Sequence, residues 1–385
     1  MPTAAIVHNH PIHYKNLLFQ ELQRRELSFE VLFVASGSHN RLETPSCGYP
    51  HRWCYEGSYE NAPAPAVARF VWSSLAELDP RVVVISGYYD VAGWAAWAWA
   101  ELHGRPKLLW AESNRFDYPR RHWKERIKSA FVRRCAAANV YGESNREYLR
   151  DLGMPDSRIT TKRAVIDTGL FQYSPPRTGE HPRRVLLYVG RFSPEKNLER
   201  LLRAWARLVR DRTCPPARLA LVGYGPLEES LRGLASELRL WNTVEFRGPA
   251  LQQELPAVYR GADALVLPSL REPWGLVVLE GMACGLPVAV SNLCGCARDV
   301  VSDATGVTFD PCSDEDLLSA LRDLMSRPQA QLESMGCAAS EVACQYTPQN
   351  SARLVMATVA SLLAGAGASA CLGSPKDLPH LAEES

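Results

Sequence analysis

Two glutamates flank a predicted helix start in the C-terminal half of the sequence. Glu272 precedes Pro273, and a residue before proline favours extended or turn backbone, so Glu272 is predicted to lie in a loop. Gly275 and Leu276 begin the helix, where free backbone N–H groups favour an anion, and Glu280 lies further along it. These groups can address hydroxyls, a phosphate and more hydroxyls along one ligand, as a nucleotide sugar presents them. In isolation, two such glutamates also fit a surface loop and a solvated helix position.

Two basic residues, Arg191 and Lys196, lie in the segment GRFSPEKN, directly after a predicted strand, Val185–Val189. Arg191 and Lys196 are predicted to lie on a loop before a helix that starts near Asn197. Two positive charges close to a helix N-terminus suit a diphosphate, whose charge must be neutralised when it leaves. The alternative is a pair of surface charges on a polar loop.

The order of these segments resembles that in family 4 of the retaining glycosyltransferases (group 1 glycosyltransferases), which have the GT-B fold. The resemblance covers about Arg184 to Met325 and rests on these segments: GRFSPEKN, LVGYGPLEESLR, VEFRGP, LVLPSLREPWGLVVLE, MACGLPV and TGVTFDP. It implies two Rossmann-like domains facing across a cleft, an acceptor site in the N-terminal domain and a nucleotide-sugar donor site in the C-terminal domain.

The resemblance also implies roles for single residues. Arg191 and Lys196 would hold and stabilise the leaving diphosphate, Glu272 would contact the donor sugar, of hexosyl type, and Glu280 the ribose hydroxyls. Retention of the anomeric configuration is implied in the same way. We identify no enzymic nucleophile in the sequence, and we predict neither a cofactor nor a required metal. The residues implied to flank the base or to offer N–H groups to phosphate are Gly248, Leu251, Gly275 and Leu276.

The N-terminal half departs from the family pattern after its first predicted strand. Where the family has glycines, this chain reads HNHPIHYKN. We expect His13 and Lys15, together with His10 and Asn16, to face the mouth of the cleft and to contact acceptor or phosphate. Structural capping is the alternative for these residues. His8, His10 and His13 could in principle bind a metal, although this loop supplies no carboxylate ligand.

A second departure follows the predicted strand Lys107–Trp110. Many family members have a histidine there, whereas this chain continues as AESNRF. Glu112 or Ser113 would take that place and orient an acceptor hydroxyl. Glu112 fits a capping or supporting role equally well.

The segment from Tyr118 to Ala136 combines seven Lys or Arg residues with one Glu, and Asp117 with Pro119 predicts the start of its helix. A packed helix with a solvated basic side is the first interpretation, and peripheral contact with an anionic membrane or a lipid-diphosphate acceptor is the second. The apolar stripe expected to pack consists of Trp123, Ile127, Ala130 and Phe131.

A D-x-D sequence, from Asp314 to Asp316, is spelled like the metal-binding motif of a different glycosyltransferase fold. Here it opens a helical pattern, with Ser313 at the N-cap position and Asp316 three residues later. That spacing is typical of a capping box, so the structural interpretation is preferred.

Composition narrows the class of protein. The 385 residues contain 43 Lys and Arg against 42 Asp and Glu, a balance that argues against a dedicated nucleic-acid binder. The start, MPTAAIVHNHPIHYKNL, lacks the pattern of a secretory signal, so we expect a cytoplasmic protein whose 11 cysteines are mostly reduced. The inner face of a membrane is the alternative location.

Strand-like and helical segments alternate in both halves, which predicts two doubly wound α/β domains. The donor base, the sugar and the acceptor (a glycan, a lipid-linked or a small molecule) stay open. A nucleotide-sugar epimerase and a non-catalytic nucleotide-sugar-binding subunit are the alternative functions. The expected divisions are an N-terminal domain (1–170), a linker (171–184), a C-terminal domain (185–345), a helix that packs back on the N-terminal domain (346–365) and a flexible tail (366–385).

Overall fold

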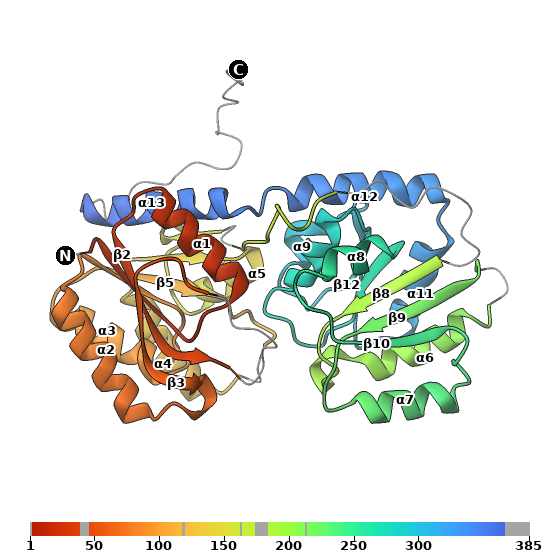
Figure 1. Ribbon diagram of the computed structural model, residues 1–385, viewed down its shortest axis with the longest axis horizontal. Coiled ribbons are helices and arrows are strands. Elements are labelled where there is room, and N and C mark those ends of the chain that lie inside the picture. Colours follow the sequence, from red (N-terminus) through yellow and green to blue (C-terminus); the bar gives the residue numbers. More distant parts are fainter. Residues whose placement is uncertain are drawn as a thin grey trace, which may run out of the picture.

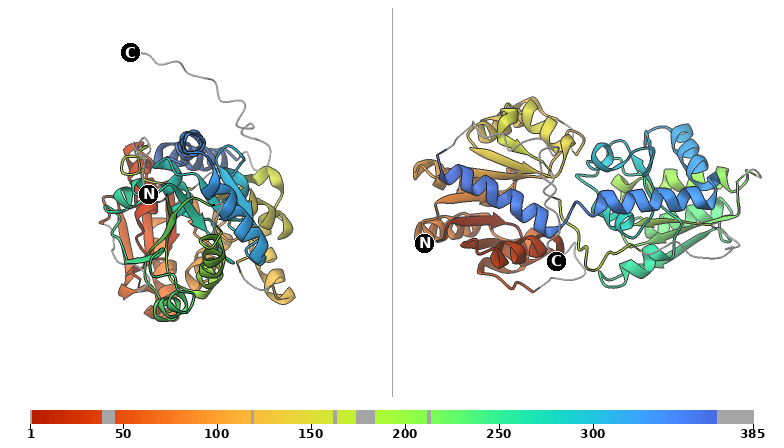
Figure 2. Two further views of the ribbon diagram at one scale, coloured as in Figure 1. Left: turned by 90° about the vertical axis from the view of Figure 1, so that its right-hand side faces the viewer. Right: turned by 90° about the horizontal axis from the view of Figure 1, so that it is seen from above.

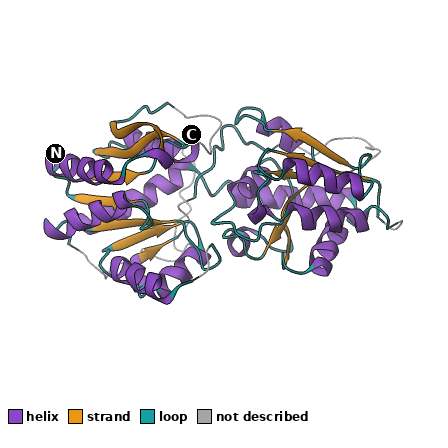
Figure 3. Ribbon diagram, turned by 90° about the horizontal axis from the view of Figure 1, so that it is seen from below, coloured by secondary structure: helices purple, strands orange, loops and turns teal. Residues whose placement is uncertain are grey.

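The computed structural model describes residues 2–38, 46–117, 120–161, 164–173, 184–211 and 214–365. Two α/β units lie side by side, each with one sheet between layers of helices (Figures 1 and 3). Both sheets are parallel throughout, so the carboxyl ends of the strands in each sheet gather at one edge. Most of the expected linker and the expected tail lie outside the described residues.

The N-terminal sheet has seven strands in the order β3-β2-β1-β4-β5-β6-β7. Its central strands contain unbroken apolar runs, AAIV in β1 and VVVI in β4, because helices cover both faces. The bounds are β1 Ala4–His8, β2 Phe29–Gly37, β3 His51–Ser58, β4 Val82–Ile85, β5 Lys107–Ala111, β6 Ala137–Val140 and β7 Ile159–Thr160.

Two separate cores sandwich this sheet. Residues of α1 and α13 fill one face, where Phe19 and Val355 pack with Ile6. Residues of α2 to α5 fill the other face, where Leu75 and Phe131 pack in the same cluster as Val7. The helix bounds are α1 His13–Arg24, α2 Ala64–Leu78, α3 Val91–Leu102, α4 His122–Arg133, α5 Glu143–Asp151 and α13 Pro348–Leu363.

The C-terminal sheet has six strands in the order β10-β9-β8-β11-β12-β13. The strand bounds are β8 Arg184–Val189, β9 Ala217–Val222, β10 Val244–Gly248, β11 Ala264–Leu267, β12 Val288–Ser291 and β13 Gly306–Phe309. The helix bounds are α6 Leu198–Leu208, α7 Glu228–Glu237, α8 Leu255–Arg260, α9 Leu276–Ala283, α10 Ala297–Val300, α11 Asp314–Ser326 and α12 Gln329–Ala343.

The last two helices join the units at their common upper side. Helix α12 lies on the C-terminal unit, and α13 crosses to lie on the N-terminal sheet (Figure 2). Thr347 caps α13 by accepting a hydrogen bond from the Asn350 backbone N–H at 3.1 Å. At its far end Thr358 accepts a buried hydrogen bond of 3.0 Å from Asn139 of β6.

Two expectations need correction. β3 was not expected, because HRWCYEGS is an edge strand without an apolar run. Helix α4 begins at His122, later than Asp117 suggested. Among the described residues, no helix is both long and apolar enough to cross a membrane.

Candidate functional site

The C-terminal loops that carry the predicted residues approach each other closely, and glycines make this possible. Gly223, after β9, has φ +147°, and a Cβ there would lie 1.8 Å from the carbonyl oxygen of Gly190, after β8. A Cβ on Gly225 would lie 2.4 Å from the carbonyl oxygen of Phe192. The Gly-x-Gly sequence therefore serves the packing of two βα loops.

An ion pair lies at the carboxyl edge of the C-terminal sheet, on the loops after β8 and β11. Lys196 Nζ lies 2.5 Å from Glu272 Oε2, and both side chains are mostly buried. Lys196 ends a short 3-10 turn after β8, whereas Glu272 lies in the loop after β11. An ammonium group has three donors, so Lys196 can hold the carboxylate and still donate to a bound anion. The exposed side chain of Arg191 lies on the same loop as Lys196.

The loop of Glu272 is held by a second segment of its own domain. Glu272 forms a parallel bridge with Cys294, and the Gly295 N–H donates to the Glu272 carbonyl oxygen at 3.0 Å. A Cβ on Gly295 would lie 1.9 Å from the Pro273 carbonyl oxygen, so only glycine fits there. Burial raises the pKa of the Cys294 thiol, which keeps this support uncharged.

The predicted helix start is confirmed. Gly275 caps α9 with φ +101°, a left-handed conformation that favours glycine, and Leu276 is its first residue. Glu280 lies one turn further along, and its Oε2 accepts a 2.8 Å hydrogen bond from the buried Tyr259 hydroxyl. Burial raises the pKa of Tyr259, so this phenol donates rather than ionises.

The loop predicted to flank the base follows β10. Gly248 has φ +72° and accepts a 2.7 Å hydrogen bond from the Gly223 N–H, which joins this loop to that after β9. Leu251 is half-exposed, and its N–H donates to Glu254 Oε2 at 2.7 Å near the start of α8.

The predicted N-terminal contacts need correction, because Lys15 does not face a cleft mouth. Helix α1 begins at His13, so the positions of Lys15 and Asn16 turn toward the sheet; Lys15 is 1% exposed. Its ammonium pairs with Glu112 and lies 5.3 Å from the ring centroids of Trp110 and Tyr141.

The other polar residues of this segment also have structural partners. Asn16 is buried and bonds to the Tyr49 hydroxyl at 2.6 Å, while His10 is buried against Tyr59. His13 is half-buried at the start of α1. Within the described parts of the chain, no group of three or more His, Cys, Asp or Glu side chains is arranged to hold a metal ion.

Glu112 remains the most accessible carboxylate at the carboxyl end of β5. It pairs with Lys15 and accepts a 2.7 Å hydrogen bond from the Tyr141 hydroxyl, while about a third of its side chain is exposed. Tyr141 lies against Trp274, two residues beyond Glu272, with ring centroids 5.6 Å apart. Glu112 and the loop that carries Glu272 are therefore neighbours.

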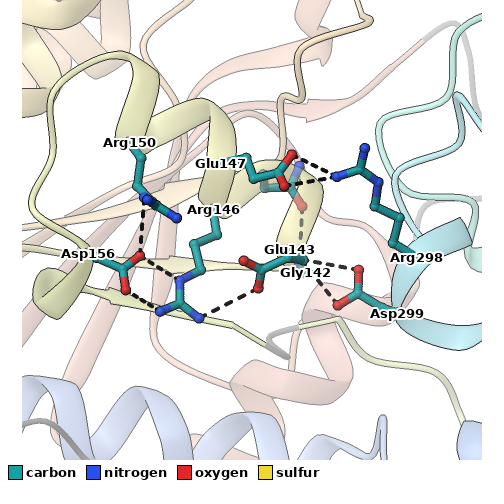
Figure 4. A network of polar contacts seen from close by, with 9 residues as sticks. Gly142, Glu143, Arg146, Glu147, Arg150, Asp156, Arg298 and Asp299 are labelled. Carbon is teal, nitrogen blue, oxygen red and sulfur yellow. Dashed lines mark hydrogen bonds and ion pairs between the residues drawn. The ribbon is translucent and has the colours of Figure 1, made fainter.

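Further polar contacts join the two domains near Tyr141 and Trp274. Asp299, after β12, accepts hydrogen bonds from the Glu143 backbone N–H at 3.1 Å, at the start of α5 (Figure 4). Arg298 pairs with Glu147 of the same helix at 2.9 Å. Because the Asp299 carboxylate caps a helix of the other domain, its charge interacts favourably with the helix dipole.

Asn114, two residues after Glu112, was missed in the sequence analysis. Its amide donates to the carbonyl oxygens of Glu272 and Pro273 in the other domain. The letters AESNRF contain it, yet nothing in them shows that the residue crosses a domain boundary. Only the three-dimensional contact identifies it.

The basic helix α4 also differs from expectation. Trp123 is 58% exposed, Ile127 is 46% exposed and Ala130 is also exposed, so Phe131 is the one residue of the predicted stripe that is buried. Tyr118 and Pro119 lie outside the described residues. The D-x-D prediction is confirmed as a cap: the Ser313 hydroxyl accepts from the Asp316 N–H at 3.1 Å.

Two parallel Rossmann-like domains whose carboxyl edges meet define a GT-B glycosyltransferase fold. Sucrose-phosphate synthase from Thermosynechococcus elongatus superimposes with a TM-score of 0.76 at 20% identity, over 94% of this chain and 100% of that one. Anabaena HepE in complex with UDP-glucose superimposes with a TM-score of 0.71 at 17% identity, over 93% and 99%.

The family follows from the sequence matches. Residues 174–341 match the model of the "Glycosyl transferases group 1" family, so the C-terminal half of the chain carries a group 1 glycosyltransferase domain. Glycogen synthase of Mycobacterium tuberculosis is 34% identical over 53% of this chain and 49% of its own length. D-inositol 3-phosphate glycosyltransferase of Paenarthrobacter aurescens is 28% identical over 76% of both chains. The matched stretch thus spans about half the length of the glycogen synthase.

Proposed function

We propose that this protein is a retaining glycosyltransferase that moves a hexosyl-type sugar from a nucleoside-diphosphate donor to an acceptor held by the N-terminal domain. The observation that carries the proposal is the meeting of the Lys196–Glu272 pair with the Gly275 helix start at one carboxyl edge. A cation, a carboxylate and free N–H groups then lie where the diphosphate and sugar of one donor would bind.

The residues have distinct parts in the proposed reaction. The bond between the anomeric carbon and the diphosphate oxygen breaks, and the acceptor oxygen bonds to that carbon on the same face. The acceptor proton passes to the departing phosphate oxygen. Lys196 and Arg191 stabilise the negative charge of the leaving group, and Glu272 stabilises the positive charge that develops on the sugar. Glu280 holds the ribose, and Gly248 and Leu251 flank the base.

No metal is proposed for this reaction, because Arg191, Lys196 and the N–H groups of Gly275 and Leu276 supply the positive potential. Turnover should therefore survive chelation. Loss of activity with EDTA, restored by magnesium, would overturn this part of the proposal.

The proposed acceptor site includes a groove beside the carboxyl end of β2 and along β3. The groove encloses about 610 Å³, within the range of roughly 300–1,000 Å³ typical of small-ligand sites. Trp53 stands half-exposed in it beside His51, with ring centroids 5.2 Å apart. An indole face beside hydroxyls suits the ring of a sugar or cyclitol. The serines that line the groove are Ser36, Ser38, Ser46 and Ser58.

Peripheral contact of a cytoplasmic protein with the inner face of a membrane is proposed for α4 and its flanks. Exposed Trp123 and Ile127 accompany the cations Arg121 and Lys124. Apolar side chains beside cations fit the interface of an anionic bilayer.

Thermal unfolding in the presence of nucleoside diphosphates tests the donor site, because a ligand that binds the folded state raises its stability. UDP heads the panel, since a structure with the same fold was solved with UDP-glucose. Turnover of the matching nucleotide sugar is then measured with and without glycan, lipid-linked and small-molecule acceptors. Release of a free epimerised nucleotide sugar would instead identify an epimerase, and binding without turnover a non-catalytic subunit.

A further inference from the structure

The backbone carbonyl oxygen of Glu272 accepts a hydrogen bond from the N-terminal domain. The Asn114 side-chain Nδ2 donates to the Glu272 carbonyl oxygen at 3.0 Å and approaches the Pro273 carbonyl oxygen at 3.3 Å. Asn114 follows β5 of the N-terminal sheet, whereas its two acceptors follow β11 of the C-terminal sheet. One amide therefore bridges two consecutive carbonyl groups across the boundary.

Hydrogen bonds within its own domain also hold Asn114 in place. Its side-chain oxygen accepts from the Phe116 N–H at 2.7 Å, and its own backbone N–H donates to Asp117 Oδ2 at 2.8 Å. Asn114 and Asp117 are both buried. This small turn fixes the amide in one orientation, so that its N–H bonds point at the other domain with little entropy left to lose.

The contact reaches the side chain that we assign to the sugar. The Glu272 carbonyl oxygen accepts from Asn114 of one domain and from the Gly295 N–H of its own domain at 3.0 Å. The Glu272 carboxylate, on the same residue, pairs with Lys196. A change in the separation of the two domains would therefore move the backbone that carries the carboxylate.

We propose that Asn114 is a positioning residue that places the Glu272 carboxylate for reaction when the two domains are in contact. This inference rests on the proposed function of Glu272 at the donor sugar. Small displacements of a group at the reacting centre cost large factors in rate, so a hydrogen bond to its backbone acts on kcat. The nucleotide end of the donor lies along α9 and does not depend on this bond.

A second contact across the same boundary provides the comparison. Arg298 and Glu147 pair at 2.9 Å, but both side chains are exposed and neither is bonded to the donor loop. An exposed pair of this kind contributes little to stability. If Asn114 only joined the domains, its loss would lower UDP affinity and kcat equally.

The test compares Asn114→Asp with Glu147→Gln in the full chain. Aspartate is isosteric and keeps an oxygen for the Phe116 N–H, but it cannot donate to the Glu272 carbonyl. Asn114→Ala, which adds no charge, is the second variant. We expect both Asn114 variants to lower kcat at least about tenfold, with UDP affinity within about twofold of the unmodified protein. Glu147→Gln should keep both values within about twofold.

Amide hydrogen exchange gives a readout that does not depend on turnover. Peptides covering 270–276 and 294–297 should exchange faster in both Asn114 variants and at the unmodified rate in Glu147→Gln. Unchanged exchange in these peptides would overturn the positioning role, as would an equal loss of UDP affinity and kcat. If exchange responds as expected while the unmodified protein turns over no nucleotide sugar, the contact exists and the proposed function fails instead.

Discussion

The two domains share one architecture but use their carboxyl edges differently. In the C-terminal domain Lys196, Glu272, Gly275 and Glu280 come from two neighbouring βα segments and lie at a single edge. In the N-terminal domain Lys15, expected at the cleft, is instead the buried partner of Glu112. Lys196 and Glu272 are far apart in sequence, but their loops follow neighbouring strands, β8 and β11, so the order of the sheet brings them together. Lys15 and Glu112 meet only through the packing of α1 against the sheet.

This comparison predicts the largest effects at the donor loop. Changing Glu272 to Gln removes a charge next to the developing positive charge, so kcat should fall by roughly 10²–10³, the scale for loss of one preorganised electrostatic group. Changing Glu280 to Gln weakens a ground-state contact to the ribose and should mainly raise the donor KM, by a factor corresponding to about 1.5–3 kcal/mol.

Steady-state kinetics and separate UDP affinities decide between these roles. Glu272→Gln should retain UDP binding, and Glu280→Gln should weaken it. The opposite pattern would mean that the two roles are exchanged, and normal kinetics in both variants would move the site elsewhere.

Asp117 allows a pH test of the N-terminal side. Burial raises its pKa from 3.8 to about 6, assisted by the negative charge of Glu272 and opposed by the Asn114 N–H and Lys128. Because the folded pKa lies above the unfolded one, the native state binds more protons between these values. Stability should therefore fall as pH rises from about 4 to 6, and it stays lower above that range.

Asp117→Asn should lack this fall. The interval between 3.8 and about 6 corresponds to about 3 kcal/mol, so the variant should gain up to that much over the unmodified protein at pH 8 relative to pH 4. Urea unfolding at both pH values measures it. A parallel pH dependence of the two proteins would show that another group causes the fall.

Lys15 tests whether the N-terminal cation is structural. Lys15→Met keeps a side chain of similar length but removes the ion pair with Glu112. This loss should lower the free energy of unfolding by about 1.5–3 kcal/mol. UDP affinity should not change. Loss of acceptor or phosphate binding without loss of stability would restore the role first expected from the sequence.

Trp53 tests the proposed acceptor groove, with Trp72 as a matched control. The two indoles are 41% and 40% exposed, but Trp72 lies on α2 outside the groove. Trp53→Ala should raise the acceptor KM about tenfold while donor KM stays constant, because a stacked ring contributes about 0.5–1.5 kcal/mol beyond its area. Equal effects of Trp53→Ala and Trp72→Ala would remove the groove from the acceptor site.

An effect that depends on ionic strength is expected at α4. Reversing the charge of Arg121 and Lys124 should weaken sedimentation with vesicles rich in phosphatidylserine, by about 1 kcal/mol for each charge at low salt. Contacts with such a surface are screened over roughly 8–10 Å at physiological ionic strength, so the difference should shrink as salt rises. If the unmodified protein stays in solution with these vesicles at low salt, α4 is only a packed helix.

Local sequence was sufficient for several strands, one helix start and one helix cap of the C-terminal domain. Apolar runs predicted the central strands, Gly275 after a proline-containing loop predicted the start of α9, and Ser313 with Asp316 predicted a cap. These features depend on residues near one another in the chain: backbone conformation, helix periodicity and cap hydrogen bonds. The same locality explains why β3 was missed, because an edge strand is defined by its partner β2 more than by its own residues.

Tertiary structure decided the rest. Whether Lys15 faces solvent or the sheet depends on where α1 begins and on Trp110, Glu112 and Tyr141, which come from other strands. Asn114 becomes a contact of Glu272 only when two sheets face each other. The chain alone determines which chemical groups are available and which elements carry them. The partners of these groups depend on packing between segments far apart in sequence, and local sequence patterns do not specify such packing.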